Sequence, residues 1–200
     1  MKLACVGNAL YDIIAFVETD FASRFGLHVG STVHTERAQL ESLIKTLVSA
    51  SSGAGGGAAN TARVFSSLGY RSSFAGMIGT DALGSRFSAD LESAGVELFM
   101  QVDEAPTGIF CVMIAPDGQR TIAVAPGPAT RLDAASIPDR FFAPDSTLYM
   151  DGFLAASPET VQAIVARAQA AGMRIALDVA GFRIATKNRS FFLKLIRESC

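Results

Sequence analysis

One block near the end of the chain restricts the fold most, because strand, helix and strand patterns follow one another there without interruption. Thr147 to Met150 form an apolar run typical of a buried strand. A helix follows, with Ser157 at the N-cap and Pro158 as its first residue, and ends at Gly172. Residues 174–179 again have a strand pattern. Strands joined by a helical crossover are parallel, and parallel sheets carry helices on both faces. The block therefore predicts a doubly wound α/β fold.

The preceding residues mostly continue this alternation. Strands are predicted over 3–6, 13–17 and 72–78, and helices over 36–49, 58–68 and 83–95. The Ser/Gly-rich segment 51–57 predicts no regular element. Strand patterns at 96–102, 108–115 and 120–124 then follow one another without a long helix, and Asp117-Gly118 predicts a hairpin between the last two. These strands are expected to form a small accessory sheet.

The last residues, 191–200, have a helical pattern that no Gly, Asn or Pro closes. A sheet that stopped here would keep an open edge beside an uncovered apolar face. We therefore expect the natural protein to be longer, with the C-terminal part of the fold missing from this chain.

Composition argues against several classes of partner. Lys and Arg total 17 and Asp and Glu total 19, giving a net charge of −2 with no basic run, which disfavours a nucleic-acid surface. The three cysteines and two histidines match no metal-ligand spacing. The N-terminus does not have the pattern of a signal peptide, and no apolar run approaches the roughly 20 residues of a spanning helix. We expect a cytoplasmic protein without a membrane partner.

Three polar segments are candidates for a ligand site. Asn8 and Asp12 flank the exit of the first strand, where open α/β sheets bind ligands. The glycine run 53–57 enters the helix that carries Asn60, and glycines allow close backbone approach. This run also fits G-x-G-x-x-A, so an NAD(P)-binding Rossmann oxidoreductase is one alternative, although the run does not directly follow a predicted strand. Asp81 has the position of an N-cap for the helix after it.

Taken together, these segments resemble the N-terminal signature of the ribokinase-like (PfkB) carbohydrate kinase family, over about residues 3–130. The matching motifs are Gly7-Asn8 with Asp12, Gly55-Gly56-x-x-x-Asn60-x-Ala62, Leu68-Gly69, Gly76 and Gly79-x-Asp81-x-x-Gly84. Pro106-Thr107-Gly108 and the strand pair after it look like the family's lid. The opening Gly-Asn-Ala-Leu-Tyr-Asp, Asp151-Gly152-Phe153 and Ser157-Pro158-Glu159 are similar to its adenosine kinase branch.

The resemblance implies a three-layer Rossmann-type fold over residues 1–200, incomplete at its C-terminal side, with lid strands from about 12–18, 96–102 and 108–125. It implies an ATP- and Mg²⁺-dependent kinase that phosphorylates a primary hydroxyl of a sugar or nucleoside, and a homodimer formed through the lid is one expectation. It also implies the substrate-binding residues, which would be Asn8, Asp12, Gly55, Gly56, Asn60, Ile109 and Phe110, with Arg120 of the lid directed toward phosphate.

The family's catalytic base is an Asp in a Gly-Ala-Gly-Asp motif, which does not occur in residues 1–200. Asp178-Val179-Ala180-Gly181 is no substitute, because its Asp precedes the glycine and ends a strand. The expected base therefore lies beyond Cys200, and we expect the 200-residue chain alone to be inactive. A non-catalytic sugar- or nucleoside-binding module is the second alternative.

Overall fold

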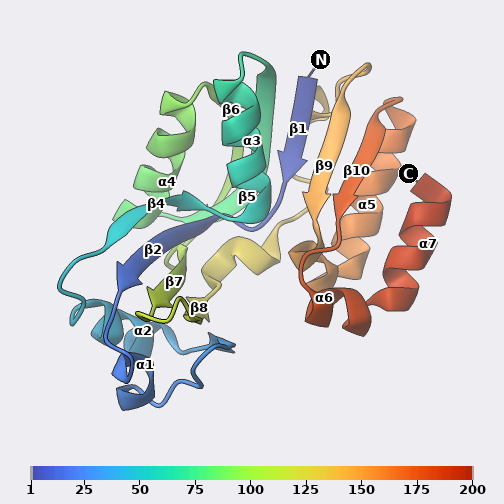
Figure 1. The fold of residues 1–200 in the computed structure, drawn as a ribbon. Coiled ribbons are helices and arrows are strands. Elements are labelled where there is room, and N and C mark those ends of the chain that lie inside the picture. Colours follow the sequence, from blue (N-terminus) through green and yellow to red (C-terminus); the bar gives the residue numbers. More distant parts are fainter. Residues whose placement is uncertain (1, 200) are drawn as a thin grey trace.

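The computed structural model describes residues 2–199 and contains two five-stranded sheets (Figure 1). The main sheet is parallel and has the strand order β10-β9-β1-β5-β6. Its strands are β1 (Lys2–Val6), β5 (Arg71–Gly79), β6 (Val96–Asp103), β9 (Thr147–Asp151) and β10 (Arg174–Asp178). The predicted α/β class with a parallel sheet is confirmed.

Helices cover both faces of the main sheet because its strands are apolar on both sides. In β1, Leu3 and Cys5 pack in one core cluster with residues of α3 and α4, whereas Ala4 and Val6 pack in another with residues of α5 and α7. This arrangement gives the predicted three layers. The helices are α3 (Gly57–Ser67), α4 (Ala82–Ser93), α5 (Pro158–Ala170) and α7 (Arg189–Ser199), and the short α6 (Phe182–Lys187) precedes α7.

The second sheet is mixed, with the order β3-β8-β7-β2-β4. It contains the strand pair predicted for the lid at 108–125, and this sheet with its helices is called the lid below. One of its faces packs with α1 and α2 in a core of its own, which includes Leu40, Leu43, Cys111 and Met113. The lid elements are β2 (Leu10–Phe16), α1 (Phe21–Arg24), β3 (Thr32–His34), α2 (Arg37–Ile44), β4 (Ser51–Gly55), β7 (Gly108–Ile114) and β8 (Arg120–Ala125).

The strand predicted for the lid at 96–102 lies instead in the main sheet. As β6 it pairs with β5 in parallel register from Ser72 opposite Val96 to Gly79 opposite Asp103. The glycine-ended helix α4 is the crossover between them, so this pair is one more βαβ unit. The lid takes β3 and β4 in its place.

The Ser/Gly-rich segment predicted to be irregular also differs, since Ser51–Gly55 form the edge strand β4. Its residues pair antiparallel with β2, with Gly53 opposite Asp12 and Gly55 opposite Leu10. Backbone pairing with β2 therefore makes this segment a strand, although its Ser and Gly residues have little intrinsic preference for one.

The block that most restricted the fold is confirmed: β9, α5 and β10 form a parallel unit, and Pro158 is the first residue of α5. The predicted C-terminal helix is confirmed as α7 up to Ser199, and Cys200 lies outside the described residues. Three 3₁₀ segments, Gly127–Arg131, Asp139–Phe141 and Gly152–Ala156, complete the fold. Among residues 2–199, no helix has the length and apolar character needed to cross a membrane.

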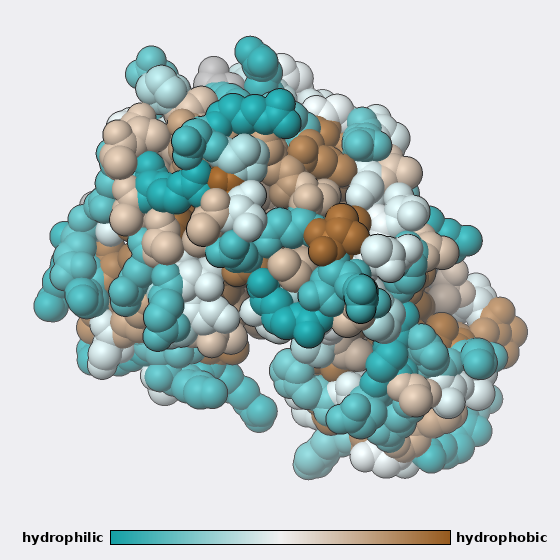
Figure 2. All heavy atoms as spheres, turned by 180° about the vertical axis from the view of Figure 1, so that it is seen from behind, coloured by the Kyte–Doolittle hydropathy of each residue, from teal (hydrophilic) through white to brown (hydrophobic). Residues whose placement is uncertain are grey.

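Seen from behind, the lid is a separate lobe at the lower right, and an open recess divides it from the rest of the molecule at the lower edge (Figure 2). The carboxyl ends of β1, β9 and β10 point toward this edge in Figure 1. Ligands of open α/β sheets bind outside the carboxyl ends of the strands. The residues near the recess are therefore the candidates for a ligand site.

Candidate functional site

Asp12 is presented by the lid strand β2 and lines a cavity of about 200 Å³. The other lining residues are Ile14, Ser51, Ser52, Gly53, Ala54 and Arg63. Burial raises the pKa of Asp12 from 3.8 to about 6, and the positive charge of Arg63 acts in the opposite direction. A partly buried carboxylate that borders a cavity is suited to accept hydrogen bonds from ligand hydroxyls.

The glycine loop lies directly against β2. A Cβ atom at Gly55 would collide with the Asp12 carboxylate, and one at Gly56 would collide with the Asn8 carbonyl oxygen. Gly56 also has a φ of +95°, which L side chains rarely adopt. The glycines thus bring the start of α3 next to Asp12, where a larger residue at either position would separate them.

Asn60 lies in the first turns of α3 and is joined to the same cavity through Arg63. The Arg63 Nη2 donates to Asn60 Oδ1 at 2.7 Å, and its Nη1 donates to the Ala54 carbonyl at 3.4 Å. With Oδ1 engaged, the Asn60 amide nitrogen can donate to a ligand hydroxyl while Asp12 accepts. The structure therefore brings the predicted residues Asp12, Gly55, Gly56 and Asn60 into one region.

Arg63 is a site residue that the sequence analysis missed. It follows Asn60 by three residues, and residues at this spacing share a helix face. The spacing indicates that Arg63 lies beside Asn60, but only the packing of α3 against the β2–β4 edge brings Arg63 to the Asp12 cavity.

The lid face that carries Asp12 continues away from the cavity through one residue of each neighbouring strand. Phe110 pairs with Asp12, Val124 pairs with Phe110, and His34 pairs with Val124, so all four lie in one row on the same face. Ile109 points the other way and is 2% exposed in the lid core. Phe110 is therefore the one of the two predicted lid contacts that shares a face with Asp12.

Arg120 lies apart from this group, and Asn8 adjoins it through its carbonyl oxygen beside Gly56. Arg120 is exposed at the start of β8, opposite Ile114, and forms no ion pair with any residue from 2 to 199. Asn8 lines a much smaller hollow with Thr130 and Phe153. The predicted roles of both residues stay predictions.

Asp151, at the end of β9, supports the glycine loop from below. Asp151 is only 3% exposed. Its Oδ2 accepts a hydrogen bond from the Ala58 N–H and its Oδ1 accepts one from the Phe153 N–H, both at 3.2 Å. Burial raises the pKa of Asp151 to about 6 although these hydrogen bonds lower it. The carboxyl group joins β9 to the first turn of α3 and so helps to place Asn60.

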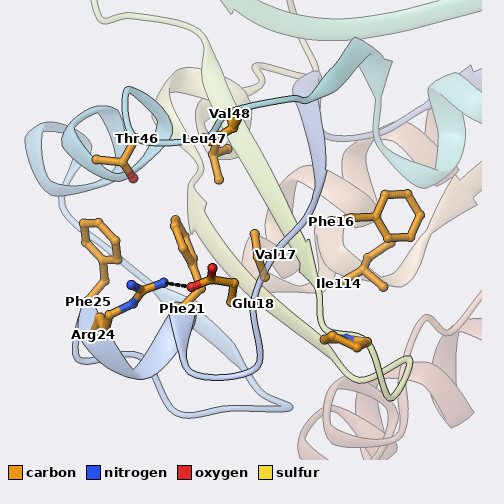
Figure 3. A pocket seen from close by; sticks show the side chains of 11 residues that line it. Phe16, Val17, Glu18, Phe21, Arg24, Phe25, Thr46, Leu47, Val48 and Ile114 are labelled. Atoms are coloured by element: carbon orange, nitrogen blue, oxygen red, sulfur yellow. Dashed lines mark hydrogen bonds and ion pairs between the residues drawn. The ribbon is translucent and has the colours of Figure 1, made fainter.

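A larger hollow, of about 780 Å³, lies elsewhere on the lid, between α1, the end of α2 and the ends of β2 and β7. Figure 3 shows Phe21, Phe25 and Leu47 around it, with the Arg24 and Glu18 side chains 2.8 Å apart in an ion pair. It shares no lining residue with the Asp12 cavity. Its walls are mostly apolar, and the charges of Arg24 and Glu18 already neutralise each other.

Comparison with known proteins agrees with this geometry. The family model described as "pfkB family carbohydrate kinase" matches residues 1–189. The guanosine-inosine kinase of Escherichia coli K12 is 30% identical over 158 residues, which cover 74% of this chain and 36% of that protein. The chain therefore spans about a third of the length of this curated relative.

Two solved structures are similar over nearly the whole chain. Adenosine kinase from Sinorhizobium meliloti has a TM-score of 0.85 and 28% identity, over 99% of this chain and 62% of that one. A probable sugar kinase from Rhizobium etli has a TM-score of 0.87 and 24% identity, over 99% and 61%, respectively. The second likeness supports the fold alone. On the strength of the family match and the shared fold, the chain belongs to the pfkB family of carbohydrate kinases, with relatives in its adenosine kinase branch.

Proposed function

We propose that this chain is the substrate-binding part of a kinase that transfers the γ-phosphoryl group of ATP to a primary hydroxyl of a nucleoside, or of a related sugar. The observation that carries the proposal is the placement of the Asp12 carboxylate and the Asn60 amide around Arg63, beside the glycine loop. An acceptor at Asp12 and a donor at Asn60 suit the two vicinal hydroxyls of a ribose ring.

The lid row favours a nucleoside over a monosaccharide. Three strand spacings of about 4.8 Å separate Asp12 from His34, a span of about 14 Å. A ribose held at Asp12 would place its base over Phe110, which is half-buried, and the far edge of the base would approach the exposed His34. The names of the relatives agree, since one is a guanosine-inosine kinase and another an adenosine kinase.

In this proposal the residues of the chain bind and orient the acceptor, and the lid excludes water from it. ATP with Mg²⁺ supplies the phosphoryl group when bound. Within residues 2–199, no three potential metal ligands gather, so the proposal assigns none of these residues to the metal and derives no step through it. Arg120 is retained as the lid residue that would approach the transferred phosphate, because its guanidinium suits that charge.

The glycine loop gives no support to a nicotinamide cofactor. It follows β4, the edge strand of the lid, whereas the dinucleotide fingerprint follows a strand of the parallel sheet. The homodimer through the lid and the cytoplasmic location stay predictions.

The test is a phosphorylation assay on the protein as its gene encodes it, with Mg-ATP and a panel of guanosine, inosine, adenosine and ribose. We expect a nucleoside to be phosphorylated. Asp12→Ala should weaken nucleoside binding by about ten- to a hundredfold, at about 1.5–3 kcal/mol for a charge-assisted hydrogen bond, and Asn60→Ala by about two- to tenfold, at about 0.5–1.5 kcal/mol for a neutral one. Asp20→Ala, which removes an exposed lid carboxylate, is the matched control. Full activity of both site variants would refute the proposed site.

A further inference from the structure

The root of the lid strand β7 is fastened to the main sheet through Thr107, which is fully buried. Its Oγ1 donates to Asp81 Oδ1 at 2.5 Å and accepts from the Gly79 N–H at 2.9 Å, and its own N–H donates to Asp81 Oδ2 at 3.2 Å. The Asp81 carboxylate also accepts from the Gly84 N–H at 3.1 Å, which confirms it as the N-cap of α4. One carboxylate thus holds both the start of α4 and the start of β7.

Arg37, the first residue of the lid helix α2, reaches the same place from the other side. Its Nη1 donates to the Thr107 carbonyl oxygen, and its Nη2 lies 3.8 Å from Asp81 Oδ2. Its Nε is bound to Glu41 Oε1 at 2.7 Å, one turn later in the same helix. The guanidinium therefore extends from the lid to the β5–α4 junction of the main domain, and Glu41 orients it.

The Asp81 carboxylate and the Arg37 guanidinium are both charged at neutral pH. Burial acts to raise the pKa of Asp81, but the hydrogen bonds from Thr107 and Gly84 and the charge of Arg37 together lower it. The side chains of Arg37 and Asp81 are 25% and 28% exposed, so their attraction is less screened than that of an ion pair on the open surface.

The contacts among Arg37, Asp81 and Thr107 affect the ligand site because only a short stretch of β7 separates Thr107 from the lid residues beside Asp12. Gly108 follows Thr107 and lies opposite Leu10, and Phe110, two residues further, lies opposite Asp12. A Cβ atom at Gly108 would collide with the Pro126 carbonyl oxygen, which leaves this root little freedom. A rotation of the lid about Thr107 would move Phe110 and the rest of β7 relative to α3 and Asn60.

We propose that Arg37 is a positioning residue that fixes the lid over the acceptor cleft by bridging α2 to Thr107 and Asp81. Its kinetic consequence rests on the proposed function, whereas its effect on lid mobility does not. The bridge holds the lid face of Asp12 and Phe110 at the distance from α3 that a bound nucleoside requires, and opening of the lid breaks the contact between Arg37 and Asp81.

The first test is amide hydrogen exchange on the protein as its gene encodes it, without ligand. Arg37→Met keeps most of the side-chain length but removes the guanidinium, and we expect exchange in β7 and β8 to become about tenfold faster, with β1 and β5 unchanged. Arg37→Lys, which keeps the charge without the forked donors, should restore part of the protection. Arg24→Met, which removes the other ion-paired lid arginine, on α1, should leave β7 and β8 unaffected.

Two results would overturn the proposal: unchanged exchange in the lid of Arg37→Met, or equal acceleration in both sheets, which would mean that Arg37 stabilises the whole fold. In an Asp81→Asn background, where the N-cap is kept by asparagine, Arg37→Met should add less acceleration than it does in the unmodified protein, because only its hydrogen bond to the Thr107 carbonyl oxygen remains to be lost. An additive effect would show that the two residues act independently.

The second test uses turnover. Arg37→Met should raise KM for the nucleoside about tenfold and change kcat less than threefold, because it misplaces the lid without touching the reacting groups. If the unmodified protein phosphorylates neither a nucleoside nor ribose, the proposed function fails, and the exchange experiment still decides the role of Arg37.

Discussion

Replacing Asp12 with asparagine is expected to stabilise the fold while it weakens the ligand site. Burial raises the pKa of this carboxyl from 3.8 to about 6, so it ionises less readily in the folded protein than in the unfolded chain. At about 1.4 kcal/mol for each pH unit, the difference corresponds to about 3 kcal/mol for a fully buried group. Because the side chain is only partly buried, screening by water reduces the expected gain to about 1–2 kcal/mol.

The size of this stabilisation depends on pH. Below pH 3.8 the carboxyl is protonated in both states and costs nothing, whereas above pH 6 it is charged in both and its full cost is present. The gain from Asp12→Asn should therefore be largest near pH 8 and vanish near pH 4.

Urea unfolding of the two proteins at pH 4, 6 and 8 measures the gain, with Asp20→Asn as an exposed control. Calorimetric titration with a nucleoside at pH 8 should show binding weakened by about ten- to a hundredfold, since a charge-assisted acceptor contributes about 1.5–3 kcal/mol. A variant that is less stable than the parent at pH 8, or one whose change is the same at pH 4 and pH 8, would refute the reasoning.

Three further perturbations test other parts of the structure. Arg63→Met removes a charge that lowers the pKa of Asp12, so the pH at which nucleoside binding is half-maximal should rise above about 6; titrations between pH 5.5 and 8 that give an unchanged midpoint would contradict this role. His34→Ala should weaken nucleoside binding by about fivefold in a competition assay and leave ribose binding unaltered, because only the base reaches that end of the lid row. Phe74→Ala should cost about 3–5 kcal/mol in urea unfolding, since Phe74 is fully buried against Phe87 with ring centroids 5.7 Å apart; a loss below about 1 kcal/mol would show that the core collapses around the deletion.

The doubly wound fold could be predicted because its signal is local. The strands around Ala4, Phe74 and Leu148 are continuous apolar runs, and Ser157-Pro158 and Gly172 mark the ends of α5 without reference to any other part of the chain. Each of these patterns requires only its own residues and a hydrophobic interior.

The lid was harder to predict because its strands are defined by their partners. Ser51–Gly55 contain residues that disfavour strands, and they are ordered by pairing with β2. The hydrophobic pattern of residues 96–102 suits a strand of either sheet. Only the parallel pairing with β5 assigns this strand to the main sheet. The same limit applied to Arg63 and Arg37, because Asp12, which lines a cavity with Arg63, and Thr107, which Arg37 binds, are distant from them in sequence.

The edge strand β4 runs without a break into the glycine loop and then into α3. The rim of the lid and the helix that carries Asn60 are thus one length of backbone, with Gly56, at a φ of +95°, as the residue between them. Under the proposed function, a hydroxyl bound at Asn60 would be connected to the edge of the lid by covalent backbone as well as by contacts between side chains.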